Sequence, residues 1–234
     1  FSPAESIIAT ASDDRTVKLW HTETGGRMAT FTGHTDEVWR VEFSPDGALL
    51  VSAGKDGALR WWNVENESNA RIVRTEKPVS ALAFSRDGRF VAWAEGALGE
   101  SCTIRVQDRR TSDGPAVLEG HRDQVQGLTF SPDGEMLASG GWDRTVIVWN
   151  TRTMQQFGRL RGHAGAVRAV AFAPDGKAVF SASDDNTIRR WELRTESQPE
   201  IFRGHSETVA DIALTPDGQY VVSASTDRTV KIWD

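Results

Sequence analysis

The feature that most constrains this chain is a set of four residues that recurs at fixed spacing. Histidine, serine, aspartate and tryptophan follow one another in steps of 18, 4 and 6 residues, four times within 234 residues. The sets are His34, Ser52, Asp56 and Trp62; His121, Ser139, Asp143 and Trp149; His163, Ser181, Asp185 and Trp191; and His205, Ser223, Asp227 and Trp233. Self-similarity at such a period predicts a repeat architecture, in which each unit buries its apolar face against the next unit.

Within one repeat, short β-prone segments alternate with turns. Segment 164–172 carries apolar residues at Val167, Val170 and Phe172 and ends in the turn sequence Ala-Pro-Asp-Gly. Segments 178–183 and 187–191 follow as further strands, and 198–202 as a weaker fourth one. No stretch has an apolar stripe of helical period with capping residues. Short strands separated by Pro, Gly, Asp and Asn predict an all-β fold.

The repeated pattern resembles the WD-repeat family of β-propellers. The resemblance rests on Gly-His, on the turn Phe-Ser-Pro-Asp-Gly, on Ser-x-x-x-Asp-x-x-Thr-Val and on a closing Trp-Asp or a variant of it, and it covers the chain from end to end. It implies blades of four antiparallel strands that stand radially around a channel.

We expect residues 1–234 to form one propeller domain of six recognisable repeats. Their approximate ranges are 1–32, 33–73, 74–119, 120–161, 162–203 and 204–234. Phe1 aligns with Phe43, so the first repeat is expected to lack its innermost strand, and the last repeat stops at Asp234 before an outermost strand. We therefore expect a section of a larger protein, whose ring would have the seven blades that are commonest in the family.

The third repeat departs from the pattern. Thr75 stands in place of the histidine, Trp93 in place of the serine and Gln107 in place of the tryptophan. The turn from Glu95 to Cys102 is also longer than its counterparts. Two interpretations remain open: a blade that has drifted under weak constraint, or a blade remodelled for a partner.

Serine, histidine and aspartate together also occur in hydrolases, as nucleophile, base and orienting group. A structural network explains them better here. The tryptophan N–H can donate to the serine oxygen, the serine O–H to histidine, and the histidine N–H to aspartate, which satisfies every member. An enzyme needs one such site, whereas this sequence has four evenly spaced copies. We predict a non-catalytic protein.

Metal, cofactor and membrane sites are not expected. Four of the five histidines belong to the repeated sets, His21 stands alone, and the only cysteine is Cys102. Carboxylate pairs such as Asp13-Asp14 lie in predicted turns.

A single cysteine fits a reducing compartment, so we expect a cytoplasmic protein. No apolar run is long enough to cross a bilayer. The net charge of −6 argues against a nucleic-acid partner, unless Lys55 and Arg168 cluster with other arginines.

The family resemblance places partner-binding side chains before and at the start of each innermost strand, and just before each turn aspartate. On this sequence these positions give a candidate set for binding other proteins or peptides: Glu37, Trp39, Lys55, Gln124, Gln126, Trp142, Arg168 and Asp184. Trp39 and Trp142 are not part of the repeated sets, and aromatic residues are frequent hot spots of interfaces. The alternative for Trp39 is packing against a neighbouring blade along the channel wall. Trp142 lies in a predicted turn, where burial is harder to arrange, which favours binding.

The sequence thus predicts a protein-interaction scaffold with signalling partners. A second hypothesis is a sensor or autoinhibitory domain beside an effector domain in a larger bacterial signalling protein, because the repeats are so alike. A propeller hydrolase or lyase is the rival from another class, and it would need acid and base residues in the channel beyond the repeated sets.

Overall fold

The computed structural model describes residues 1–195 and 197–234, which form 22 β-strands and no helix. The predicted all-β fold is therefore confirmed. Within the described residues, nothing folds into the long apolar helix that a membrane span would need.

Six antiparallel sheets contain these strands, and each sheet is built from strands that follow one another in sequence. The two outer sheets have three strands each: β1 (Ile7–Ala11), β2 (Val17–His21) and β3 (Arg27–Phe31), and β20 (Val209–Leu214), β21 (Val221–Ser225) and β22 (Val230–Trp233). The second sheet comprises β4 (Val38–Phe43), β5 (Leu49–Gly54), β6 (Ala58–Asn63) and β7 (Asn69–Arg74).

The remaining three sheets also have four strands each. The third comprises β8 (Val79–Phe84), β9 (Phe90–Glu95), β10 (Cys102–Asp108) and β11 (Ala116–His121). The fourth comprises β12 (Val125–Phe130), β13 (Met136–Gly141), β14 (Thr145–Asn150) and β15 (Gln155–Arg161). The fifth comprises β16 (Val167–Phe172), β17 (Ala178–Ser183), β18 (Thr187–Glu192) and β19 (Glu200–Arg203).

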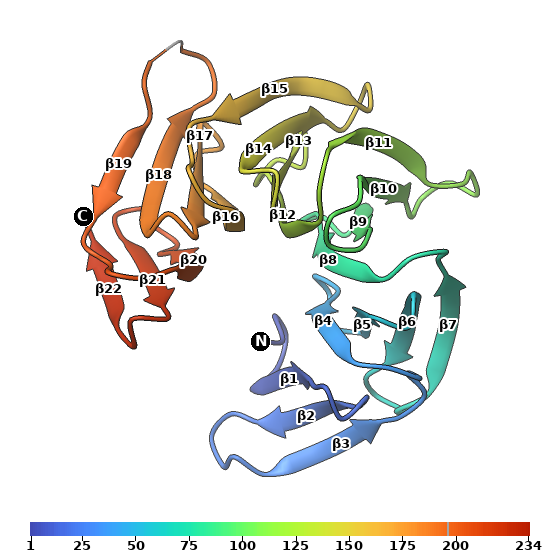
Figure 1. Ribbon diagram of the computed structural model, residues 1–234. Helices are drawn as coiled ribbons and strands as arrows, with labels where there is room; N and C mark the ends of the chain where they lie inside the picture. Colours follow the sequence, from blue (N-terminus) through green and yellow to red (C-terminus); the bar gives the residue numbers. More distant parts are fainter. Residues whose placement is uncertain (196) are drawn as a thin grey trace.

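The sheets stand side by side in an arc around a central axis, as propeller blades do (Figure 1). The strands β4, β8, β12, β16 and β20 are innermost, and each contacts the innermost strand of the neighbouring sheet. The sheets β1–β3 and β20–β22 lie at the two ends of the arc (Figure 1). The first sheet lacks the innermost strand and the last sheet lacks the outermost one, as the sequence predicts.

The turn after each innermost strand explains the recurring Ser-x-Asp-Gly. In the second sheet, the Ser44 hydroxyl accepts a hydrogen bond from the Leu49 N–H at 3.0 Å and donates to Asp46. Gly47 has φ of 73°, in the left-handed region that glycine adopts without steric cost. The same backbone turn occurs in the next four sheets, where Gly88, Gly134, Gly176 and Gly218 have φ of 68°, 72°, 70° and 73°. The serine position is Ala173 in the fifth sheet, which has no hydroxyl, and Thr215 in the sixth. These turns fix the register of the two inner strands.

The hydrophobic core lies between neighbouring sheets, and not in the centre of the ring. Five clusters of buried residues each combine side chains from two adjacent sheets, as in the contact of Phe31 with Trp62 at 5.1 Å between ring centroids. At the end of the arc, Val230 and Ile232 on β22 are 67% and 69% exposed. Burial of each sheet's faces thus depends on its neighbours, as in other repeat folds.

Candidate functional site

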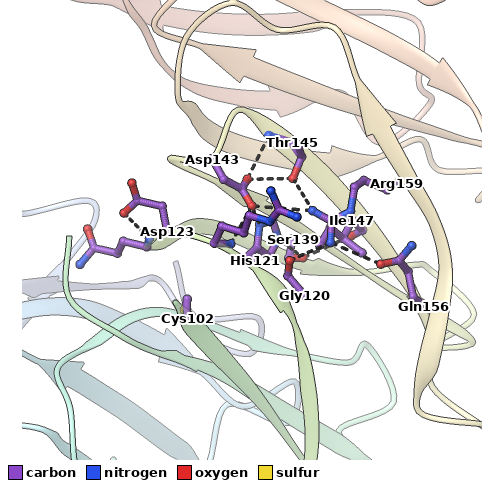
Figure 2. A network of polar contacts seen from close by, with 12 residues as sticks. Cys102, Gly120, His121, Asp123, Ser139, Asp143, Thr145, Ile147, Gln156 and Arg159 are labelled. Atoms are coloured by element: carbon purple, nitrogen blue, oxygen red, sulfur yellow. Dashed lines mark hydrogen bonds and ion pairs between the residues drawn. The ribbon is translucent and has the colours of Figure 1, made fainter. Parts of the chain in front are cut away.

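The four repeated residues meet in one buried network. Figure 2 shows three of them, His121, Ser139 and Asp143, for the fourth sheet. His121 lies between Ser139 and Asp143: its Nε2 is 2.8 Å from the serine Oγ and its Nδ1 is 3.0 Å from the carboxylate. The Trp149 indole N–H donates to the same Oγ at 2.9 Å. The network therefore links the end of β11, the outermost strand of the third sheet, to β13 and β14 of the fourth sheet.

The other three sets have the same geometry. The distance from histidine Nε2 to serine Oγ is 2.7 Å for His34, 2.7 Å for His163 and 2.8 Å for His205. The indole N–H donates to that oxygen at 2.8 Å from Trp62, 2.8 Å from Trp191 and 2.9 Å from Trp233. The structure brings all sixteen residues together as four separate sets of four, one in each of four sheets.

The aspartate has a second role in each set, because it also binds the backbone. Asp143 accepts hydrogen bonds from the Arg122 N–H at 3.0 Å and from the N–H of Thr145 at 3.1 Å. Burial opposes ionisation of Asp143, but the hydrogen bonds from His121, Arg122 and Thr145 outweigh it and hold its pKa well below the ordinary value. An ionised carboxylate only accepts, so histidine Nδ1 carries the proton and Nε2 accepts from serine.

These sets are poor candidates for catalysis. The side chains of His34, His121, His163 and His205 are at most 1% exposed, so no substrate reaches the imidazole. Burial lowers the pKa of His34, with Asp56 acting in the opposite sense. A neutral, enclosed imidazole with both nitrogens bonded has no free position for proton transfer.

Two sheets differ from this arrangement. In the first sheet, Thr10 stands in place of the serine and accepts from the Trp20 indole N–H at 2.9 Å, and Asp14 pairs with Lys18 at 2.7 Å. In the third sheet, the Trp93 indole N–H donates to Glu95 at 2.7 Å, and the guanidinium of Arg105 donates to the same oxygen at 2.8 Å. Trp93 also packs in the core between the second and third sheets.

Glu95 and Arg105 were not singled out by the sequence pattern, because neither position belongs to the repeated set. Glu95 is only 5% exposed, and carboxylates are almost never buried to this extent unless they are paired. The Thr75 hydroxyl lies within hydrogen-bond distance of two backbone carbonyl oxygens, those of Gly57 at 2.9 Å and Lys77 at 2.6 Å. Gln107 likewise donates to the carbonyls of Asp108 and Asp113 at 2.8 and 2.9 Å. The third sheet thus has a polar network of its own.

The candidate partner-binding residues lie where the innermost strands are irregular. Each innermost strand has a β-bulge near its start, and the bulged residues are Trp39, Ser80, Gln126, Arg168 and Ala210. A bulge leaves one residue out of the ladder and redirects its side chain. The rim is the name that we give to three kinds of residue: these five, the residue before each innermost strand, and the turn residue whose backbone N–H is bonded to it.

In each of the five sheets that have an innermost strand, one backbone hydrogen bond ties the turn to the residue before that strand. Its N–H donors and carbonyl acceptors are Lys55 and Glu37 at 3.0 Å, Gly96 and Pro78 at 3.0 Å, Trp142 and Gln124 at 2.9 Å, Asp184 and Ala166 at 2.9 Å, and Thr226 and Thr208 at 3.0 Å. The sequence reasoning did not assign Pro78, Ser80 and Gly96. Counting back four residues from Phe84, as from Phe43 to Trp39, would have found Ser80.

Side chains of the second sheet interlock at the rim. The half-buried Trp39 donates its indole N–H to Glu37 at 3.0 Å, and Lys55 pairs with Glu37 at 3.1 Å. Arg40 donates to the backbone and side-chain oxygens of Gln126 at 3.2 and 3.1 Å, which joins the second sheet to the fourth. These contacts hold the polar groups in fixed positions.

On the fourth and fifth sheets, Trp142, Arg168 and Asp184 form a stack. The Arg168 guanidinium lies 4.3 Å from the centre of the Trp142 ring, and Asp184 accepts two hydrogen bonds from it at 2.6 and 2.8 Å. Trp142 is half-buried, and its buried indole N–H has no hydrogen-bond partner in the part of the chain that the structure describes. Trp142 thus packs against the neighbouring sheet while part of its surface stays accessible.

Among the described residues, no group of three or more His, Cys, Asp or Glu side chains is arranged to hold a metal ion. Cys102 is buried, and burial raises the pKa of its thiol to about 11. The thiol is therefore protonated at neutral pH and is a poor nucleophile.

Glu42 on the innermost strand β4 gives a prediction about pH. Burial raises its pKa to about 7, an effect only partly offset by the Phe84 N–H and the Phe1 ammonium group. Because the folded pKa exceeds the unfolded one, this group's contribution to stability is complete below the unfolded pKa of 4.5 and is lost as pH rises through about 7.

We expect Glu42→Gln to raise the free energy of unfolding at pH 8 by about 1–2 kcal/mol and to leave it nearly unchanged at pH 5. Urea titrations of both proteins at the two pH values measure this, because all other groups titrate alike in both. An equal difference at pH 5 and pH 8 would show that Glu42 does not change its charge in this range.

Comparison with known proteins agrees with the fold. The family described as "WD domain, G-beta repeat" matches residues 1–21, 25–63, 115–150, 154–192 and 196–234. The unmatched interval 64–114 contains most of the third sheet, where Thr75, Trp93 and Gln107 replace the repeated residues.

Similar proteins include periodic tryptophan protein 2 of Arabidopsis thaliana, 35% identical over 150 residues, which are 64% of this chain and 17% of the relative. Nuclear distribution protein PAC1 of Arthroderma benhamiae is 35% identical over 64% of this chain and 34% of its own length. Apoptotic protease-activating factor 1 of Danio rerio is 30% identical over 64% of this chain and 15% of its own length. The matched segments thus make up about a third or less of these relatives. With the family's repeats matched over most of its length, this chain belongs to the WD-repeat family.

Proposed function

We propose that this chain is a non-catalytic scaffold that binds other proteins or peptides through the rim. Proteins of the WD-repeat family are generally scaffolds without catalytic activity. We further propose that residues 1–234 act as one propeller domain. The single buried cysteine, Cys102, supports a reducing location such as the cytoplasm.

The observation that carries this proposal is the concentration of oriented aromatic and polar side chains at one end of the ring. The five bulged residues and the turns beside them come from five different sheets. Asp13, Trp39, Arg40, Ser80, Gln124 and Gln126 line a cavity of about 410 Å³ there. Binding sites are typically concave, with a few polar groups held in place. The rim therefore suits a partner that inserts a polar segment at the channel mouth.

Pre-organisation supports the same surface. Arg168 is held by Asp184 and lies on the ring of Trp142, so these side chains lose little conformational freedom when a partner binds. Trp and Arg are also the residues most often found as interface hot spots. All eight candidate residues belong to the rim. For the second and fourth sheets they include all three kinds of rim residue: the one before the innermost strand, the bulged one and the one in the turn.

The hypothesis of a sensor or autoinhibitory domain in a bacterial signalling protein gains no support from the relatives named above, because each of them is eukaryotic. The scaffold proposal does not depend on that hypothesis.

The test compares rim variants with a matched aromatic substitution elsewhere. We expect Trp39→Ala and Trp142→Ala each to weaken binding of captured partner proteins by about tenfold. Phe157→Ala removes an aromatic side chain that is 49% exposed on β15, far out in the sheet, and should leave binding unchanged. Affinity capture with quantitative mass spectrometry, followed by calorimetry on the purified partner, measures both. Unchanged affinity in both rim variants, with circular dichroism unchanged, would refute the proposal.

A further inference from the structure

The third sheet leaves a groove on the side of the arc, away from the rim. In the second and sixth sheets, the repeated tryptophan packs against an aromatic ring of the preceding sheet, as Trp62 does with Phe31 at 5.1 Å and Trp233 with Phe202 at 5.9 Å. In the third sheet this position is Gln107, whose amide donates to backbone carbonyls instead. A cavity of about 330 Å³ lies between the second and third sheets here, and Gln107 is part of its wall.

The floor of this groove is apolar and contains one unsatisfied donor. Leu49, Trp61 and Ala70 contribute apolar surface from the second sheet. Trp61 is 7% exposed and packs edge-on against Phe84, with ring centroids 5.7 Å apart. Among the residues that the structure describes, none accepts a hydrogen bond from its buried indole N–H.

Two arginines line the groove without a carboxylate partner. Within residues 1–195 and 197–234, neither Arg71 nor Arg109 forms an ion pair, and the nearby Asp108 is bonded to Arg89 at 2.8 Å. Arg109 is nonetheless held in position. It donates to the Gly88 carbonyl at 2.9 Å, and its guanidinium lies 5.4 Å from the ring centre of Trp61 and 5.6 Å from that of Phe84.

The grooves between two other pairs of sheets are more acidic. The groove between the first two sheets is lined by four acidic residues and no basic one: Glu5, Asp46, Glu65 and Glu67. The groove between the fifth and sixth sheets has Asp175, Glu200, Asp217 and Asp234 against Arg190 alone, which pairs with Glu192 and Glu200. In the groove of the third sheet, by contrast, Arg71 and Arg109 match Asp108 and Asp113 in number.

We propose that this groove, which we call the Arg71–Arg109 groove, binds an acidic peptide segment of a partner protein. An aromatic or large aliphatic side chain of the peptide would occupy the space beside Trp61, and a flanking carboxylate would pair with Arg71 and Arg109. Guanidinium groups bind carboxylates through two parallel hydrogen bonds, and Arg109 is already held by its contacts. This site is separate from the rim, so either can fail without the other.

The test uses the indole N–H signals of the nine tryptophans in a ¹H–¹⁵N spectrum, with Trp61→Phe identifying the Trp61 signal. The probe is the peptide N-acetyl-Glu-Phe-Glu-amide, and its neutral counterpart is N-acetyl-Gln-Phe-Gln-amide. We expect the acidic peptide to shift the Trp61 signal in a saturable way and the neutral peptide to shift it much less. Calorimetry gives the affinity independently of the signal assignment.

Arg71→Gln and Arg109→Gln should each lower the affinity for the acidic peptide by about threefold, as expected for partly exposed ion pairs. Arg110→Gln is the matched control, because it removes the same charge from a neighbouring side chain that is 65% exposed and pairs with Asp87. Equal effects of Arg110→Gln, equal binding of the neutral peptide or an unmoved Trp61 signal would overturn the proposal. So would a Trp61 signal that shifts on dilution without peptide, which would mean that a second copy of the chain fills the groove.

Discussion

Replacing His163 by alanine is expected to lower the free energy of unfolding by about 3 kcal/mol. In a chain of this length, such a loss lowers the melting temperature by roughly 6–12 °C. Urea titration and thermal unfolding followed by circular dichroism measure the two quantities. The effect should be large because His163 connects two other buried groups and its own side chain is only 1% exposed.

The reason is the direction of the hydrogen bonds. The imidazole Nε2 accepts from the Ser181 hydroxyl at 2.7 Å, and Nδ1–H donates to Asp185 at 2.8 Å. Alanine removes both contacts and opens a cavity beside Trp191, whose ring centre lies 5.9 Å from that of the imidazole. Ser181 then loses its acceptor, and Asp185 keeps only the hydrogen bonds from the backbone and Thr187. Unsatisfied buried groups cost more than a hydrogen bond contributes on average.

His21→Ala is the matched control for this prediction. His21 ends strand β2, belongs to no repeated set and only accepts a hydrogen bond from the Glu23 N–H at 3.3 Å. Its loss should change stability little. Equal losses in both variants, or a stable His163→Ala protein, would mean that the repeated network contributes no more than an ordinary surface contact.

The repeated sequence predicted the sheets and the four buried sets because both depend on short-range spacing. A strand of six residues, a turn with glycine at positive φ and a second strand place Ser181 beside His163 wherever the pattern recurs. The innermost strand of the fifth sheet was predicted over 164–172 and is observed as Val167–Phe172, because the chain bends at Ala164 and Gly165 before the strand begins. Boundaries therefore depend on a backbone irregularity that the sequence does not mark.

Contacts between sheets could not be predicted in the same way. Arg40 and Gln126 are 86 residues apart, and Arg168 reaches the ring of Trp142 on the neighbouring sheet. Such pairs depend on the angle between adjacent sheets and on which residue is bulged, and neither follows from a single repeat. The spacing of the repeats was thus enough to infer where the candidate residues lie. It was not enough to infer which side chains of other sheets they contact.

Glu95→Ala is expected to lower the free energy of unfolding by about 3 kcal/mol, close to the effect of His163→Ala. The two substitutions act in different sheets with different networks. Glu95 accepts from the Trp93 indole N–H and from Arg105, so alanine leaves a buried donor and a guanidinium without their acceptor. Glu95→Gln keeps an acceptor at the same place and should lose less. Urea titration at neutral pH measures all three variants.

Glu100→Ala provides the control, because Glu100 is also a carboxylate of the third sheet that pairs with a base, Lys77, at 2.7 Å. Its side chain, however, is 55% exposed. Solvated ion pairs contribute little, so Glu100→Ala should have almost no effect. This contrast tests whether the third sheet has only drifted under weak constraint. A sheet that has only drifted would tolerate Glu95→Ala as well as Glu100→Ala. A large loss for Glu95→Ala alone would mean that Trp93, Glu95 and Arg105 form a second solution to the same problem, since each sheet must satisfy a buried tryptophan N–H between its middle strands.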